Sequence, residues 1–224
     1  MIKYAGAVDI EAKSLKHNAF ILSIGWSVFN VKTLERVISH EVVIDPNCEL
    51  QVKAGRDVDE NTIAWWHGQV DYRGAPGTIA REHTWGGELS SDEAIKAFAE
   101  FTFLKLPDPD FVANEDEPWR TPKYYAPKIA MNGPDYDWPV LKTLMEELGI
   151  EYNRFFFNKL DSSRTVRDTR NELGLPAFDK NILAKYSPFG EIIEHTAICD
   201  SLIEGYELAA HYNLMQKIKD LVPL

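Results

Sequence analysis

The stretch AVDIEA at residues 7–12 places two carboxylates, Asp9 and Glu11, in an otherwise apolar segment. Side chains alternate along a strand, so both carboxylates share one face at a separation of roughly 6 to 7 Å, which a divalent cation can bridge. Two solvated acids on an exposed strand are the common alternative. Val8 and Ile10 favour a buried strand instead, where unpaired like charges would be costly. The pair therefore predicts half of a metal site.

The composition is typical of a folded globular protein. Its 224 residues are enough for one substantial core, and no long Pro-, Gly- or Ser-rich linker divides them, which predicts a single domain over 1–224. The net charge of -11 argues against a broad basic surface that grips long duplexes, but bound cations allow an acidic enzyme to hold a few nucleotides. Two distant cysteines and the lack of any run of about 18 apolar residues lead us to expect a soluble, cytoplasmic protein without a membrane span.

The order of predicted elements indicates the fold class. The expected elements are strands at 3–12, 20–31 and 36–45, helices near 61–69 and after 91, a strand at 128–131, a helix at 139–149, a strand at 155–157, and helices at 163–173 and about 196–216. Ser90 and Glu93 have capping-box spacing before the second helix. The order predicts an α/β fold with a mixed central sheet, three leading antiparallel strands and helices on both faces.

A second acidic signal is the segment NGPDYDWP at residues 132–139, where a strand gives way to a helix. Open sheets place their sites at the carboxyl ends of strands, so an acid that enters the next helix can face the same cleft as Asp9 and Glu11. Asp137 is the preferred candidate. An ordinary N-cap carboxylate explains Asp137 about as well, and Asp135 stays an alternative.

The third signal is HTAICDS at residues 195–201, before and within the last helix. Positions five apart on a helix point about 140° away from each other, so His195 and Asp200 reach one site only if His195 lies at or before the first turn. Taken alone, such a histidine is more often a surface or capping residue than a catalyst, and such an aspartate is more often a solvated helix acid.

Together, Asp9, Glu11, Asp137, His195 and Asp200 occur in an order that resembles the DEDD exonuclease superfamily, histidine subclass (DEDDh), which has a ribonuclease-H-like fold. The resemblance spans nearly the whole chain. The segments IAWWHGQ at 63–69 and RTVRDTR at 164–170 are similar to those of the branch that contains phage exodeoxyribonuclease A and the mycobacterial-type exoribonuclease. Relative to the smaller members, the stretches near 70–88 and 107–127 look like surface loop insertions.

The resemblance implies roles for individual residues. Asp9, Glu11, Asp137 and Asp200 would hold two Mg²⁺ or Mn²⁺ ions, and His195 would be the general base on the attacking water. The substrate would be contacted by the residues Trp66, Gln69, Arg167 and Arg170. Adjacent helical residues point about 100° apart, so one of Trp65 and Trp66 is expected to pack into the core while the other faces the cleft.

The implied activity is 3′-to-5′ hydrolysis of single-stranded nucleic acid with a free 3′ end, releasing nucleoside 5′-monophosphates. The length and motifs favour DNA, by resemblance to the phage enzyme, and RNA is the alternative. A non-catalytic nucleic-acid-binding module of the same fold is a third possibility, because one fold can have different functions. Related exonucleases are sometimes homodimers, which leaves the oligomeric state open.

Overall fold

A five-stranded mixed sheet forms the centre of the protein, in the order β3-β2-β1-β6-β7. The computed structural model describes residues 1–102, 105–113, 120–133, 135–150, 160–172, 174 and 178–221. The strands of the sheet are β1 (Tyr4–Ala12), β2 (Ile21–Asn30), β3 (Arg36–Val43), β6 (Lys128–Met131) and β7 (Leu160–Ser162). The first three are antiparallel, whereas β6 pairs in parallel with β1 and β7. The strand expected at 155–157 lies outside the described residues.

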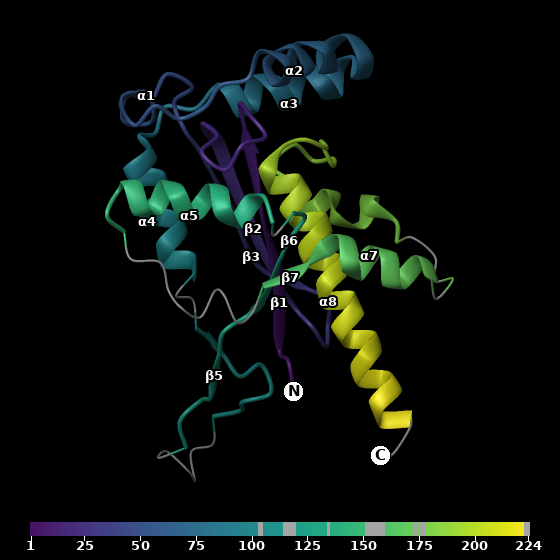
Figure 1. The fold of residues 1–224 in the computed structure, drawn as a ribbon. Helices are drawn as coiled ribbons and strands as arrows, with labels where there is room; N and C mark the ends of the chain where they lie inside the picture. Colours follow the sequence, from purple (N-terminus) through teal and green to yellow (C-terminus); the bar gives the residue numbers. More distant parts are fainter. Residues whose placement is uncertain are drawn as a thin grey trace.

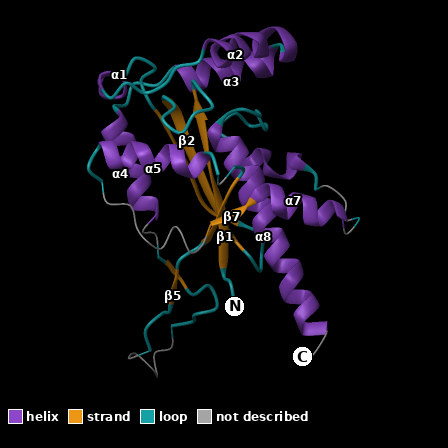
Figure 2. Cartoon of the chain, in the orientation of Figure 1, coloured by secondary structure: helices purple, strands orange, loops and turns teal. Residues whose placement is uncertain are grey.

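Helices cover both faces of this sheet. They are α1 (Glu49–Lys53), α2 (Glu60–Arg73), α3 (Ala75–Trp85), α4 (Ser91–Thr102), α5 (Asp137–Glu147), α7 (Ser163–Glu172), the 3₁₀ helix η1 (Lys180–Tyr186) and α8 (Ala197–Leu221). Figure 1 shows α4 and α5 on one side of the sheet, α7 and α8 on the other, and α2 with α3 over one end. The same layers are visible by element type in Figure 2. The predicted α/β class and mixed sheet are confirmed.

Strand β1 separates two hydrophobic cores because its side chains alternate between the faces of the sheet. Val8 and Ile10 belong to the core that contains residues of α4 and α5. Ala5 and Ala7 belong to the core that contains residues of α8. Asp9 and Glu11 are odd-numbered like Ala5 and Ala7, so their side chains point to the face of the sheet that α8 covers.

Helix α8 lies directly on the backbone of β1 and β2. A Cβ atom at Gly25 would lie 2.2 Å from the carbonyl carbon of Ala197, and one at Gly205 would lie 3.1 Å from the amide nitrogen of Ala7. The Ser27 hydroxyl donates a hydrogen bond of 2.5 Å to the carbonyl oxygen of Ser201. Small residues on both surfaces therefore allow the helix to approach the strands closely.

Several local expectations differ from the structure. The stretch near 70–88 is not a loop, because α2 continues to Arg73 and α3 follows directly. Gly74, with φ +64°, separates these helices, and proline is tolerated in the first turn of α3, where no helical N–H partner is lost. Within 107–127 the described residues include a short strand pair, β4 (Leu106–Pro107) with β5 (Tyr124–Tyr125). The last helix ends at Leu221, about five residues later than expected.

Other expectations agree with the structure. Half of the capping box is formed, since the backbone N–H of Ser90 donates to Glu93 Oε2 at 3.0 Å. Cys48 and Cys199 are buried and free. Among the described residues, no helix combines the length and apolar character that crossing a membrane requires.

Replacing Gly25 by alanine should destabilise the protein, because the new methyl group must push α8 away from β2. We expect the free energy of unfolding to fall by about 1–3 kcal/mol in urea denaturation, the usual cost of overpacking. Gly68→Ala is the matched control, since a Cβ atom there meets no atom within 4 Å and alanine favours the helix by about 0.5–1 kcal/mol. Equal stability of Gly25→Ala and the parent would contradict the close contact.

Candidate active site

The parallel pairing of β1 with β6 brings three of the predicted acids to one edge of the sheet. Strand β6 ends at Met131, and the chain turns through Gly133 into α5, whose first residue is Asp137. The backbone N–H of Gly133 donates to Asp137 Oδ2 at 2.9 Å, which fixes the carboxylate at this turn. Asp137 is 5% exposed, whereas Asp135 is an exposed residue. The structure therefore favours Asp137 over Asp135 as the third acid.

His195 lies before the first turn of α8, as the five-residue spacing requires. Its φ of +65° is in the left-handed region, which redirects the chain ahead of the helix. The backbone N–H of His195 donates to Asp200 Oδ2 at 3.0 Å. Glu11, His195 and Asp200 each offer one potential ligand atom, and these atoms all lie within 4.8 Å of one another. Residues from β1 and α8 thus form one cluster.

Burial shifts the pKa values of the acids upward. It raises the pKa of Asp200 to about 7 and that of Asp137 to about 6, opposed by the backbone hydrogen bond that each accepts. The pKa of Asp9 and of Glu11 is raised well above the usual range, first by burial and then by neighbouring carboxylates. Burial and the charge of Arg73 lower the pKa of His195, so its imidazole is neutral at pH 7 and able to accept a proton.

This arrangement fits a divalent cation. Buried carboxylates of like charge repel each other, and a cation would replace that repulsion by attraction. Carboxylate oxygens are the ligands that Mg²⁺ and Mn²⁺ prefer. The donor set and its burial therefore match metal ions that are hard oxygen binders.

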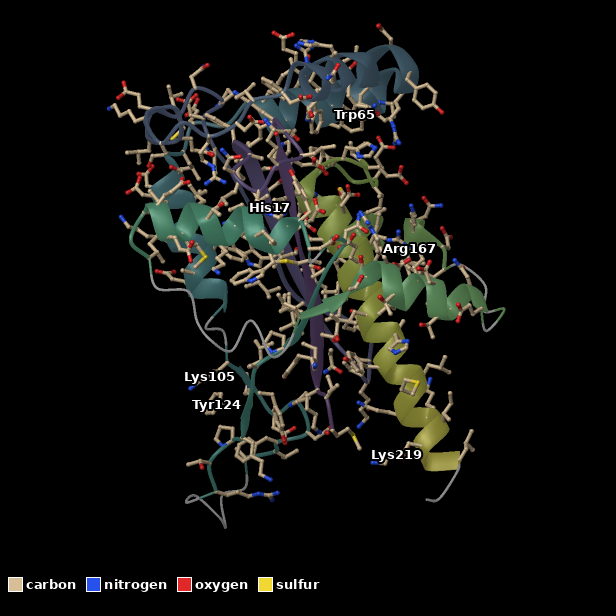
Figure 3. All side chains as sticks on the ribbon, viewed as in Figure 1. His17, Trp65, Lys105, Tyr124, Arg167 and Lys219 are labelled. Carbon is tan, nitrogen blue, oxygen red and sulfur yellow. The ribbon has the colours of Figure 1, made fainter. Side chains whose placement is uncertain are left out.

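The two tryptophans of α2 differ in exposure, as expected for adjacent helical residues. Trp66 is only 1% exposed, and its indole Nε1–H donates to the Ala12 carbonyl at 3.4 Å. Trp65 is 43% exposed and lies edge-on to the His195 ring at 5.0 Å between centroids. Figure 3 shows Trp65 on the layer formed by α2 and α3. Both tryptophans line one cavity, but Trp65 offers the accessible face, and the substrate contact predicted for Trp66 stays a prediction.

The other predicted substrate contacts differ in whether they line a cavity. Gln69 is buried where α2 meets α3, with its backbone facing Gly77, and it is not among the residues that line the two cavities described here. Arg167 and Arg170 line a polar cavity of about 410 Å³ together with Asp9. Arg167, on α7 in Figure 3, also pairs with Glu207 on α8 at 3.4 Å. The arginines therefore share a cavity with the acids, and Gln69 does not.

A second cavity, of about 680 Å³, adjoins the acids on the side of Glu11. Trp65, Leu15 and Thr62 contribute to its wall. Tyr136 lines it as well, and the Tyr136 hydroxyl donates to the Ser14 carbonyl at 2.5 Å, which holds the segment after β1 in place. This more apolar cavity suits a flat, hydrophobic group.

Two further acids, which were not predicted from sequence, lie near the site. Glu194 precedes His195 and pairs with Arg73 at 2.9 Å and Lys180 at 2.8 Å, and these partners hold its pKa at about 2. Glu204 lies four residues after Asp200 on α8 and is 3% exposed. The i, i+4 spacing from Asp200 is the only sequence signal for Glu204, and ordinary solvated helices show the same spacing.

The sheet order and the helices on its two faces define the α/β fold of DEDDh exonucleases. The nuclease domain of 3′hExo, a DEDDh family member bound to rAMP, superposes with a TM-score of 0.51 at 12% identity, over 97% of this chain and 93% of that one. Product-bound exonuclease I gives 0.52 at 11% identity, over 97% and 44%. The zinc-bound form of the E. coli ExoI–ssDNA complex gives 0.50 at 11% identity, over 98% and 42%. This chain thus spans less than half of the exonuclease I chains, and these similarities show the fold.

The family follows from sequence. The model of the 3′-5′ exoribonuclease Rv2179c-like domain matches residues 5–203, so the chain belongs to this family and is a 3′-5′ exonuclease that acts on nucleic acid. A comparison with curated proteins finds no match. The group of Glu11, His195 and Asp200 described above could hold a metal ion.

The raised pKa values of Asp200 and Asp137 predict how the metal-free protein responds to pH. Both folded-state values lie above the unfolded ones, so their stabilisation is complete at low pH and is lost as pH rises through about 6 and 7. In EDTA we expect the free energy of unfolding to fall by roughly 1–3 kcal/mol between pH 5 and pH 8. Added Mg²⁺ should reduce the fall, and Asp200→Asn should flatten it. Identical pH slopes for the parent and Asp200→Asn in EDTA would contradict the raised pKa.

Proposed function

We propose that this protein removes nucleotides from the 3′ end of single-stranded RNA by a two-metal mechanism and releases nucleoside 5′-monophosphates. The single observation that supports it most is the cluster of Glu11, His195 and Asp200, whose ligand atoms lie within 4.8 Å of one another. Asp9 and Asp137 complete the acid set that the family pattern requires. A binding module without activity would gain nothing from holding these like charges together in a buried place.

The residues divide the chemistry between them. Asp9, Glu11, Asp137 and Asp200 would hold two Mg²⁺ or Mn²⁺ ions, which when bound stabilise the charge that builds on the attacking and leaving oxygens of the phosphodiester. His195 is the general base, and its neutral imidazole accepts the proton of the attacking water. The hydrogen bond from the His195 backbone to Asp200 keeps the base beside the acids.

The two cavities receive different parts of the substrate. The cavity beside Glu11 takes the terminal nucleoside, with Trp65 as its stacking face. The polar cavity takes the phosphates, because Arg167 and Arg170 line it. Aromatic stacking and phosphate contacts do not read sequence, so we infer that cleavage is largely independent of the base.

The polymer is proposed to be RNA because the family is described by exoribonuclease activity. The DNA preference expected from sequence depends on the resemblance to the phage branch, and DNA is therefore the second candidate. A contact to the 2′-hydroxyl is the feature that separates the two.

The direct test uses single-stranded RNA and DNA of equal sequence, labelled at the 5′ end, with Mg²⁺, Mn²⁺ or EDTA. We expect a descending ladder on RNA with either metal and none in EDTA, because the acids act through bound cations. Asp200→Asn should abolish the ladder, whereas Asp220→Asn, an exposed acid at the far end of the same helix, should leave it unchanged. Faster degradation of DNA would reverse the polymer assignment, and intact RNA and DNA under every condition would exclude the enzyme activity.

Removing the exposed indole of α2 should weaken substrate binding. Stacking of a base on an aromatic side chain contributes about 1–3 kcal/mol, so Trp65→Ala should raise KM about 5- to 150-fold. Trp65→Phe should recover part of the loss. Tyr72→Ala is the control, because Tyr72 is an exposed aromatic residue on the same helix and lines neither cavity. If Trp65→Ala and Tyr72→Ala have the same KM, Trp65 does not stack on the substrate.

A further inference from the structure

One face of α8 carries a column of three acids, Asp200, Glu204 and Glu207, all of which line the polar cavity of about 410 Å³. Residues four and three positions apart on a helix are neighbours on its surface. Asp200 accepts the hydrogen bond from the His195 backbone, and Glu207 pairs with Arg167 at 3.4 Å. The two ends of the column are therefore accounted for, and Glu204 stands between them.

Glu204 has the surroundings expected of a carboxylate that binds a cation. Its side chain is buried, and Oε2 has no hydrogen-bond partner among the described residues. The Ser163 hydroxyl at the start of α7 donates to Asn132 Oδ1 at 3.4 Å. A buried carboxylate with a free oxygen is costly unless an opposite charge compensates it. The cavity that Glu204 lines also contains Asp9 and Asp200.

The charges around Glu204 come mainly from the acids of the site. The carboxylates of Asp200 and Asp137 raise its pKa after burial does, and Glu204 in turn raises that of Asp9. Arg167 lowers the pKa of Glu204, but Arg167 forms its ion pair with Glu207, one turn further along α8. Glu204 therefore belongs electrostatically to the acid cluster more than to the arginine.

We propose that Glu204 is a fifth carboxylate of the cation site, whose free Oε2 contributes to binding the divalent metal held by Asp9 and Asp200. This inference depends on the proposed metal-dependent function and adds to it a ligand outside the four-acid pattern. The alternative is a structural acid that stays protonated and neutral in the core. The two differ in one measurable property, because only a metal-binding carboxylate changes the affinity for the cation.

The test is titration of Mn²⁺ into the full chain by isothermal calorimetry, without nucleic acid. Glu204→Gln keeps the shape of the side chain and removes its charge, and we expect it to weaken Mn²⁺ binding about 10- to 100-fold, the usual effect of losing a partner of a metal site. Glu207→Gln is the matched control, because it removes the next acid of the same column, whose charge Arg167 already compensates. Its affinity for Mn²⁺ should stay within about twofold of the parent.

The outcomes separate this proposal from the metal-dependent function itself. If Asp200→Asn binds Mn²⁺ as tightly as the parent, the metal site as a whole is wrong. If Asp200→Asn loses Mn²⁺ but Glu204→Gln does not, only the role of Glu204 is wrong, and it is a neutral structural acid. Thermal unfolding in EDTA checks that the variants are folded. Glu204→Met, which fills similar volume without charge, is the second variant and must lose Mn²⁺ affinity in the same way.

Discussion

The backbone contact between α8 and the first two strands is the constraint on which the site depends. Gly25 and Gly205 leave no space for a side chain, and the Ser27 hydroxyl binds the Ser201 carbonyl across the same contact. Asp200 lies between these points, so its distance from the acids of β1 is set by backbone packing rather than by flexible side chains. Larger side chains at Gly25 and Gly205 would keep the same fold but would separate Asp200 from the acids of β1.

This arrangement concentrates negative charge at buried and half-buried positions, which opposes folding. The apolar residues of β1 and β2, buried on both faces of the sheet, provide the stabilisation that offsets it. The raised pKa values of the acids reflect this destabilisation, because each carboxyl group would be easier to ionise in water. Binding of a divalent cation would relieve the same repulsion, so stability and the proposed catalysis depend on one group of side chains.

The chemistry of the site was largely predictable from sequence, and its surroundings were not. Asp9 and Glu11 follow from strand alternation, which is local. The choice between Trp65 and Trp66 depends on how α2 is rotated against β1, and no local pattern of α2 records that rotation. Helix α3 was missed because its first turn contains a proline next to glycines, which in isolation indicate a turn. Glu204 looks like any acid of an exposed helix until tertiary packing buries it.

The position of His195 shows how a strained residue is held by both walls of the site. A left-handed conformation costs about 1–2 kcal/mol for a residue with a Cβ atom, so it persists only where neighbours enforce it. Asp200 accepts from the His195 backbone on one side, and Glu194 on the other is bound by Arg73 of α2 and Lys180 of η1. Each partly exposed ion pair is weak. However, the two ion pairs share the Glu194 carboxylate, so together they connect α2 and η1 to the turn that contains His195. Helices α2 and η1 line different cavities. The geometry of His195, the proposed general base, is therefore linked to both proposed substrate subsites through Glu194.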